Sequence, residues 1–175
     1  MFKKMFTRFS KVVAAGLVLS FMFLVPGAEA SHWGLSGGLQ THDPTIVRES
    51  GNTWWSASTG TGIGMKYSTN GGKTWTDGLP IFSRPLSWWK KYAPNMTTND
   101  VWAPDLEYYR GRYYCYYSVS EFGKNNSAIG LVSCSSISKG DWRDDGVVLY
   151  SRYGSSKFNA IDPNLVVDAK GKPWL

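Results

Sequence analysis

Apolar and polar residues alternate in short runs along most of the chain after residue 40, and Gly, Asn and Asp separate the runs. Most runs are rich in aromatic and β-branched residues, which favours strands. No long stretch spaces its apolar residues as the 3.6-residue period of an α-helix requires. Short strands separated by such turns predict an all-β sandwich, barrel or propeller. The predicted strands are Thr45–Val47, Thr53–Ser58, Ile63–Ser68, Leu106–Tyr109, Arg112–Ser120, Ala128–Ser133, Val147–Tyr150 and Asn164–Val167.

Two segments, Ile63–Phe82 and Ile129–Tyr150, repeat the same order of features. Each is interpreted as a short strand, a polar connector that carries a Trp, an Asp-Gly turn and an outer strand. The two copies begin about 66 residues apart, slightly more than the usual repeat of a propeller blade. Four short strands per repeat favour a β-propeller. The chain would then hold two blades and the start of a third.

Residues 1–30 have the three parts of a secretory signal peptide. A start with four Lys and Arg residues precedes an apolar run from Val12 to Val25, and Ala28-Glu29-Ala30 supplies the small residues of a cleavage site. The apolar run is shorter than the roughly 20 residues that span a bilayer, which argues against an uncleaved anchor. We therefore expect residues 1–30 to be removed and residues 31–175 to form a partial propeller domain. The mature protein would be secreted, with no stable membrane association.

The charge of the chain argues against a nucleic-acid partner. The leader carries four of the 19 Lys and Arg residues and one of the 13 Asp and Glu residues, so removing it lowers the net charge from +6 to +3. The rest of the chain has no Lys or Arg cluster of the kind that binds phosphate backbones. A small positive charge is compatible with an acidic polysaccharide environment.

Cys115 and Cys134 are the two cysteines of the chain. In an exported protein such a pair could form a disulfide. They lie in two predicted strands joined by a turn-rich connection, and a hairpin centred near residues 124–125 would place them opposite each other. The alternative is two small, half-buried apolar residues that never pair, and both interpretations stay open. His32 and His42, the two histidines, are far from the cysteines in sequence, so no metal site is expected there.

Three aspartates adjoin a proline near the start of a predicted strand: Asp43, Asp105 and Asp162. Proline pushes the residue before it into an extended conformation, which would present an aspartate rigidly. The innermost strands of propeller blades begin beside the central axis, so the three carboxylates would converge on one cavity. An Asp-Pro pair alone can simply initiate a turn, but three at similar spacing favour a shared site. Converging carboxylates suit glycoside hydrolysis, which needs a base, an acid and often a neighbour that raises the pKa of the acid.

Two aromatic residues lie near these aspartates in sequence, and sugar rings stack on flat apolar faces. Trp102 precedes the second aspartate, and Phe122 lies at the tip of the following hairpin. Four other tryptophans are interpreted as core or surface-patch residues: Trp54, Trp55, Trp88 and Trp89.

Six segments of residues 40–175, in order, resemble glycoside hydrolase family 43, and within it most resemble the endo-1,5-α-L-arabinanases. Asn-Ala-Ile-Asp-Pro-Asn is the most specific of them. The segments are His42-Asp43-Pro44-Thr45, Val101-Trp102-Ala103-Pro104-Asp105, Tyr116-Tyr117-Ser118-Val119-Ser120, Phe122-Gly123, Asn126-Ser127-Ala128-Ile129-Gly130 and Asn159-Ala160-Ile161-Asp162-Pro163-Asn164.

The resemblance implies an inverting hydrolase on a five-bladed β-propeller that cuts α-1,5-linked arabinan, the side chain of pectin. By its match, Asp43 is the general base, and Asp162 orients the general acid and raises its pKa. Trp102 and Phe122 would lie against arabinose rings. The residues implied to line the subsites are Gly123, Asn159, Ala160 and Ile161.

The general acid of the family is a Glu from a later blade, and its match is expected beyond Leu175. The chain stops as the apolar run Pro173-Trp174-Leu175 opens, which predicts a truncated domain that is inactive alone. No cofactor is required by these residues. The family can hold a structural calcium ion on the propeller axis, partly through a His of the last blade, so no complete metal site is expected here. The protein is expected to be a monomer, and Asp105 is expected to have a structural role.

Other functions compete with this interpretation. Ser68–Trp75 nearly matches the Asp-box turn of sialidases, but no arginine cluster for a sialic carboxylate is present in a matching context. A β-xylosidase or arabinofuranosidase of the same family would use the same three acids. A catalytically silent, carbohydrate-binding propeller is a further alternative. The sequence leaves endo against exo cleavage open, because the loops that close the cleft decide it.

Overall fold

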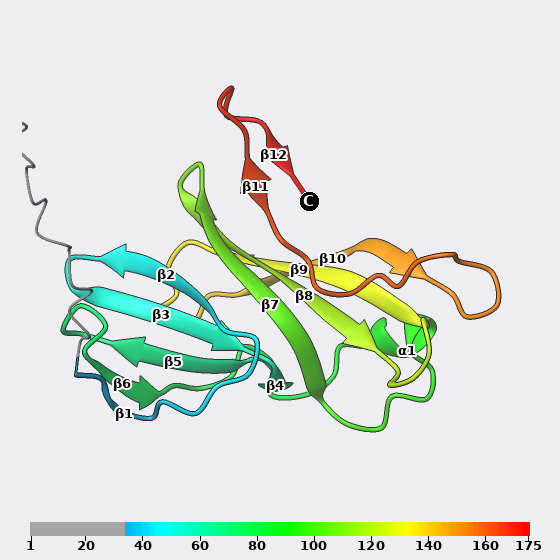
Figure 1. The fold of residues 1–175 in the computed structure, drawn as a ribbon, viewed down its shortest axis with the longest axis horizontal. Helices are drawn as coiled ribbons and strands as arrows, with labels where there is room; N and C mark the ends of the chain where they lie inside the picture. Colours follow the sequence, from blue (N-terminus) through cyan, green and yellow to red (C-terminus); the bar gives the residue numbers. More distant parts are fainter. Residues whose placement is uncertain (1–33) are drawn as a thin grey trace, which may run out of the picture. The chain divides into compact units, whose positions relative to one another are not determined.

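The computed structural model describes residues 34–175, so the predicted signal peptide at residues 1–30 lies outside the described part. Two antiparallel four-stranded sheets follow one another along the chain (Figure 1). The first contains β2 (Thr45–Ser50), β3 (Thr53–Ser58), β5 (Gly64–Ser68) and β6 (Thr74–Asp77). The second contains β7 (Asp100–Tyr109), β8 (Arg112–Ser120), β9 (Ser127–Cys134) and β10 (Arg143–Ser151).

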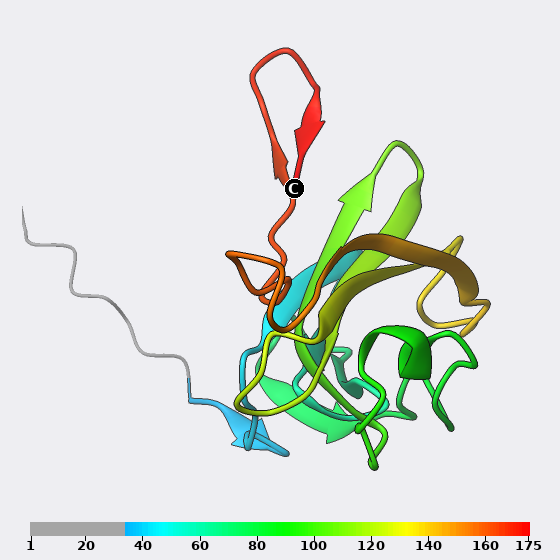
Figure 2. The same cartoon turned by 90° about the vertical axis from the view of Figure 1, so that its right-hand side faces the viewer.

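Short strands extend both sheets and begin a third. Strand β1 (Ser36–Gly37) runs parallel to the outer strand β6, and β4 (Gly60–Thr61) pairs with the inner strand β7. Strands β11 (Val166–Val167) and β12 (Pro173–Trp174) form a separate hairpin, drawn in red in Figure 2. Two sequential four-stranded sheets and a further hairpin are two propeller blades and the start of a third, as the sequence predicts.

Most strand predictions are confirmed, with differences at their ends. Strand β8 has the predicted bounds, and the one α-helix of the described residues is the four-residue α1 (Trp89–Tyr92). The predicted strand at Leu106 begins earlier, at Asp100, so Asp105 lies inside β7 rather than before it. The last predicted strand is only Val166–Val167, four residues after Asp162.

The interpretation of the Asp-Gly pairs as turns before an outer strand is wrong. In the first blade, Thr74–Asp77 is itself the outer strand β6, and the Asp-Gly pair ends it. In the second blade, Asp145-Gly146 lies inside β10, where the pairing with β9 shifts between Asp144 and Gly146. Gly146 has a φ of 86°, the left-handed region that a β-bulge of this kind uses. Both segments are rich in polar residues because outer strands are exposed, and this hides their strand character.

The core lies between the two blades. One face of β8 supplies apolar core residues, and Tyr113, Cys115, Tyr117 and Val119 are between 0% and 5% exposed. They join Ile63 and Met65 of the first blade and Trp89 of α1 in one apolar cluster. Gly130 faces the Tyr117 ring so closely that an added Cβ would lie 2.4 Å from its Cζ atom. The ring of Tyr117 therefore requires a glycine on the neighbouring strand.

The cysteines do not face each other. Cys115 pairs with Val132, and Cys134 pairs with Tyr113, so the two cysteines are offset by two residues across the β8–β9 hairpin. Both are buried and free. The hairpin is centred slightly earlier than the position that would place them opposite each other. They act as small core residues, and burial raises the pKa of the Cys134 thiol to about 12.

Glu49, at the end of β2, joins the first blade to the loop after β9. Its carboxylate accepts hydrogen bonds from Trp55 Nε1 (2.8 Å), Ser136 Oγ (2.7 Å) and the Ser138 N–H (3.1 Å), and from the Ser138 hydroxyl. Burial by itself raises the pKa of Glu49, but these hydrogen bonds outweigh it and hold the pKa below its ordinary value.

We expect Glu49→Gln to destabilise the protein by roughly 1.5–3 kcal/mol at neutral pH, the usual range for hydrogen bonds to a charged group. Because the pKa is lower in the folded state, the carboxylate stabilises the fold above its unfolded pKa. That contribution is lost as the pH falls through the folded pKa. Urea unfolding of the wild type and the variant should therefore differ at neutral pH and converge in acid. An equal difference at every pH would contradict this role.

Candidate active site

Asp43, Asp105 and Asp162 line one open hollow of about 440 Å³. The hollow lies where β2, β7 and the segment before β11 meet, so the predicted convergence of the three aspartates is confirmed. Glu107, two residues after Asp105 on β7, lines the same hollow. The remaining lining residues are Pro44, Thr45, Ala103, Pro104, Pro163 and Asn164.

The prediction that proline holds the preceding residue extended is wrong at all three turns. Asp43, Ala103 and Asp162 each precede a proline, and their φ angles are 47°, 39° and 55°. A residue with a side chain adopts such a φ at a cost of order 1–3 kcal/mol unless its surroundings hold it there. Three strained residues at one hollow are typical of a functional site.

A threonine that the sequence pattern did not single out orients Asp43. Thr59, between β3 and β4, accepts a hydrogen bond from the Ala103 N–H (2.7 Å) and donates its hydroxyl to Asp43 Oδ2 (2.8 Å). The Thr59 N–H also donates to the His42 carbonyl (2.9 Å). One side chain thus fixes two of the three strained turns relative to each other. The second oxygen of Asp43 lies 3.5 Å from His42 Nε2, and the Asp43 side chain stays 44% exposed.

Asp105 and Asp162 differ in their surroundings. Asp105 is buried, and its Oδ2 accepts a hydrogen bond from the Leu165 N–H (2.5 Å), which ties β7 to the segment that carries Asp162. Burial raises the pKa of Asp105, and its hydrogen bonds offset only part of this. Burial and then the charge of Asp105 raise the pKa of Glu107. Asp162 is exposed, and its backbone N–H donates to Ser118 Oγ (2.9 Å).

Trp102 and Phe122 lie together at a second hollow, of about 390 Å³. Their ring centroids are 6.5 Å apart and their planes meet at 74°. Phe122 is 95% exposed at the tip of the β8–β9 hairpin. Trp102 is next in sequence to Ala103, which lines the first hollow. The aromatic pair therefore lies beside the hollow of the three aspartates.

The other predicted subsite residues line neither hollow. Gly123 follows Phe122 in the hairpin turn with a φ of 76°. Ala160 is only 3% exposed, so its side chain does not reach the surface. Asn159 is exposed and Ile161 is half-buried, and both belong to the segment that leads into Asp162.

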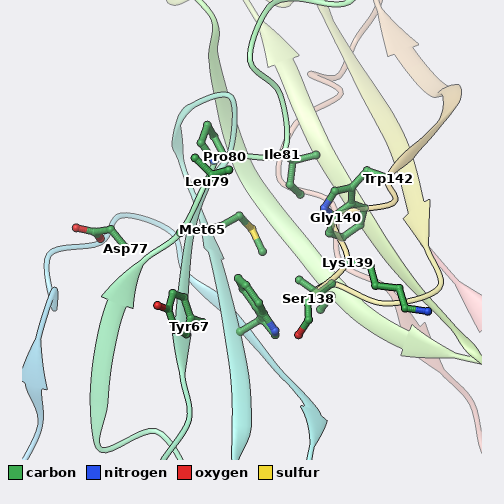
Figure 3. A pocket seen from close by; sticks show the side chains of 13 residues that line it. Met65, Tyr67, Asp77, Leu79, Pro80, Ile81, Ser138, Lys139, Gly140 and Trp142 are labelled. Carbon is green, nitrogen blue, oxygen red and sulfur yellow. The ribbon is translucent and has the colours of Figure 1, made fainter.

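A larger hollow, of about 640 Å³, lies elsewhere between the blades (Figure 3). Its apolar lining residues include Met65, Leu79, Ile81 and Trp142. Ser138 of this lining binds Glu49, and Asp77, its one carboxylate, pairs with Lys66. No carboxylate is free to act there, so the hollow with the three aspartates is the candidate active site.

Comparison with known proteins assigns the chain to a family. Residues 38–175 match the model of glycosyl hydrolases family 43. The chain belongs to glycosyl hydrolase family 43. It is 48% identical to an extracellular endo-α-(1→5)-L-arabinanase of Bacillus subtilis, over 99% of this chain and 54% of that protein. It is 37% identical to an extracellular exo-α-(1→5)-L-arabinofuranosidase of Cellvibrio japonicus, over 78% of this chain and 40% of that protein.

Solved structures of family 43 enzymes share the fold. The endo-arabinanase of Bacillus licheniformis superposes with a TM-score of 0.76 and 51% identity, over 82% of this chain and 49% of that one. Such arabinanases are five-bladed propellers, and the two blades and third hairpin described above are part of one. The chain spans about half the length of the family 43 relatives it matches.

Two further observations bear on ligands and membranes. Among residues 34–175, no three His, Cys, Asp or Glu side chains are grouped as metal ligands. Within the same residues, no helix has the length and apolar character needed to cross a membrane.

Proposed function

We propose that the protein hydrolyses α-1,5-linked arabinan with inversion, using Asp43 as the general base and Asp162 to tune the general acid. The observation that carries the proposal is the meeting of Asp43 and Asp162 at one hollow of a family 43 chain. Relatives named for action on α-1,5-linked arabinan support the choice of substrate. The aromatic surface of Trp102 and Phe122 beside the hollow suits stacked pentose rings.

In the proposed reaction, a water oxygen attacks the anomeric carbon of an arabinose unit while its proton passes to Asp43. The glycosidic carbon–oxygen bond breaks, and the leaving oxygen takes a proton from the general acid. Asp43 fits the base, because the Thr59 hydroxyl holds one carboxylate oxygen and leaves the exposed side chain able to contact water. Asp162 fits the tuning role, because a negative charge beside an acid raises its pKa. The acid itself is assigned to a Glu of a later blade.

The proposal extends to the setting of the enzyme. Residues 1–30 direct secretion and are cleaved, residues 31–175 belong to the catalytic propeller, and the enzyme acts as a monomer without a required cofactor. A structural calcium ion would need ligands from the later blades. The extracellular names of two relatives support secretion.

The test is hydrolysis by the complete gene product. We expect it to release arabino-oligosaccharides from linear α-1,5-arabinan and to leave xylo-oligosaccharides intact, with the new reducing ends first appearing as the β-anomer in proton NMR. Cleavage of xylo-oligosaccharides instead would favour the β-xylosidase alternative. Binding of arabinan without any cleavage would favour a silent propeller. Products that retain the α-configuration would refute the roles of Asp43 and Asp162.

A further inference from the structure

Four buried serines lie at one end of the second blade. Ser120, Ser127 and Ser151 stand side by side across β8, β9 and β10, because Ser127 pairs with both of the others. Ser118 lies two residues before Ser120 on β8. All four are between 0% and 5% exposed. Buried hydroxyls without partners would be costly, so their hydrogen bonds show what this end of the sheet is built to hold.

Three of these serines hold the segment Asn159–Asp162. Ser127 Oγ donates to Asn159 Oδ1 (2.6 Å), Ser151 Oγ accepts from the Ala160 N–H (3.0 Å), and Ser118 Oγ accepts from the Asp162 N–H (2.9 Å). The segment follows β10 and turns back toward β8 and β9 (Figure 1). It is not part of any strand, so side-chain hydroxyls replace the ladder hydrogen bonds that would otherwise fix its backbone. The left-handed φ of Asp162 is held by the hydrogen bond from its N–H to Ser118 on one side and by the bond from the Leu165 N–H to Asp105 on the other.

The hydrogen bonds that join Ser120, Ser127 and Asn159 have a defined direction. A serine has one proton to donate, and Ser127 gives its proton to Asn159. Ser120 must therefore donate in the 2.7 Å bond between Ser120 and Ser127. With Oδ1 of Asn159 facing the sheet, the Nδ2 group of this exposed residue is left as a donor. A sugar hydroxyl oxygen is the acceptor that such a group fits.

We propose that Ser118 and Ser127 are positioning residues, Ser118 setting the place of Asp162 and Ser127 the amide orientation of Asn159 as a donor to arabinan. This inference rests on the proposed function. The two serines are expected to have different effects. Ser118 sets the position of the Asp162 charge, which tunes the pKa of the general acid. Ser127 acts on substrate binding through Asn159.

The test compares Ser118→Ala and Ser127→Ala in the complete gene product. For Ser118→Ala we expect kcat on linear arabinan to fall by roughly 3- to 10-fold, the size of one hydrogen bond, with the basic limb of the pH profile moved to lower pH. For Ser127→Ala we expect a rise in KM by about the same factor, with kcat and the pH profile unchanged. Ser118→Cys fills the place of the hydroxyl with a thiol that accepts only weakly, and it serves if the alanine variant does not fold.

Ser133→Ala is the matched control. Ser133 is also 0% exposed and on β9, but it lies at the opposite end of the strand and accepts a hydrogen bond from Arg112 Nη2 (3.2 Å). Its removal should lower the melting temperature without changing kcat, KM or the pH profile. If Ser118→Ala and Ser127→Ala behave like Ser133→Ala, the inference is overturned. If Asp162→Asn also leaves the kinetics unchanged, the proposed role of Asp162 has failed instead.

Discussion

Asp43→Asn is expected to lower kcat/KM for linear arabinan by roughly 10²- to 10⁴-fold in the complete gene product, the range that a general base contributes. The amide cannot take the proton of the attacking water. It keeps the shape of the carboxylate, and its oxygen can still accept the Thr59 hydroxyl. The loss should therefore fall on the chemical step, and the melting temperature should stay close to that of the wild type. Reducing-sugar release under single-turnover conditions measures the effect.

Asp77→Asn is the control for Asp43→Asn. Asp77 ends the outer strand β6 and pairs with Lys66, away from the hollow of the three aspartates. This change removes the same charge from the same blade, and activity should stay unchanged. A rate for Asp43→Asn within a few-fold of the wild type would show that another group accepts the proton.

The parts of the fold that the sequence predicts well are those with local signals. Strand β8 is an aromatic-rich run between two clear turns, and its predicted bounds are those observed. Strand β6 is hard to recognise because Thr74, Thr76 and Asp77 are exposed and polar, and Trp75 is its one apolar residue. The Asn70 side chain that shapes the turn before it accepts from the Thr74 N–H (2.9 Å), which gives the Asp-box-like motif a structural role.

In the candidate site too, local motifs predict some features, and contacts between residues distant in sequence determine the others. Asp43 and Asp162 could be singled out because each stands in a recognisable Asp-Pro motif. Their left-handed backbone could not, because the local rule for residues before proline predicts the opposite. The groups that hold this backbone are distant in sequence: Thr59 binds Asp43, and Ser118 binds Asp162. An isolated Thr or Ser residue carries no signal for such contacts, so only the folded arrangement reveals them.

Asp162→Asn is expected to have the second large effect, and its pattern separates its role from that of Asp43. Without the negative charge, the pKa of the general acid falls by roughly one unit or more, so the acid is less protonated at neutral pH. Hydrolysis of arabinan should drop on the order of 10- to 100-fold, part of the full contribution of an acid catalyst. The basic limb of the pH profile should move to lower pH.

A substrate with a better leaving group tests whether Asp162 acts through the general acid. An aryl arabino-oligosaccharide releases a phenolate that needs little protonation, so Asp162→Asn should impair its cleavage much less than that of arabinan. Asp43→Asn should impair both substrates alike, because each needs an activated water. Equal losses on both substrates for Asp162→Asn would show that Asp162 does not act through the acid. Because Asp162 is exposed and Asp43 is held by Thr59, both amide variants should fold, and the ratio of the two rates reports chemistry rather than stability.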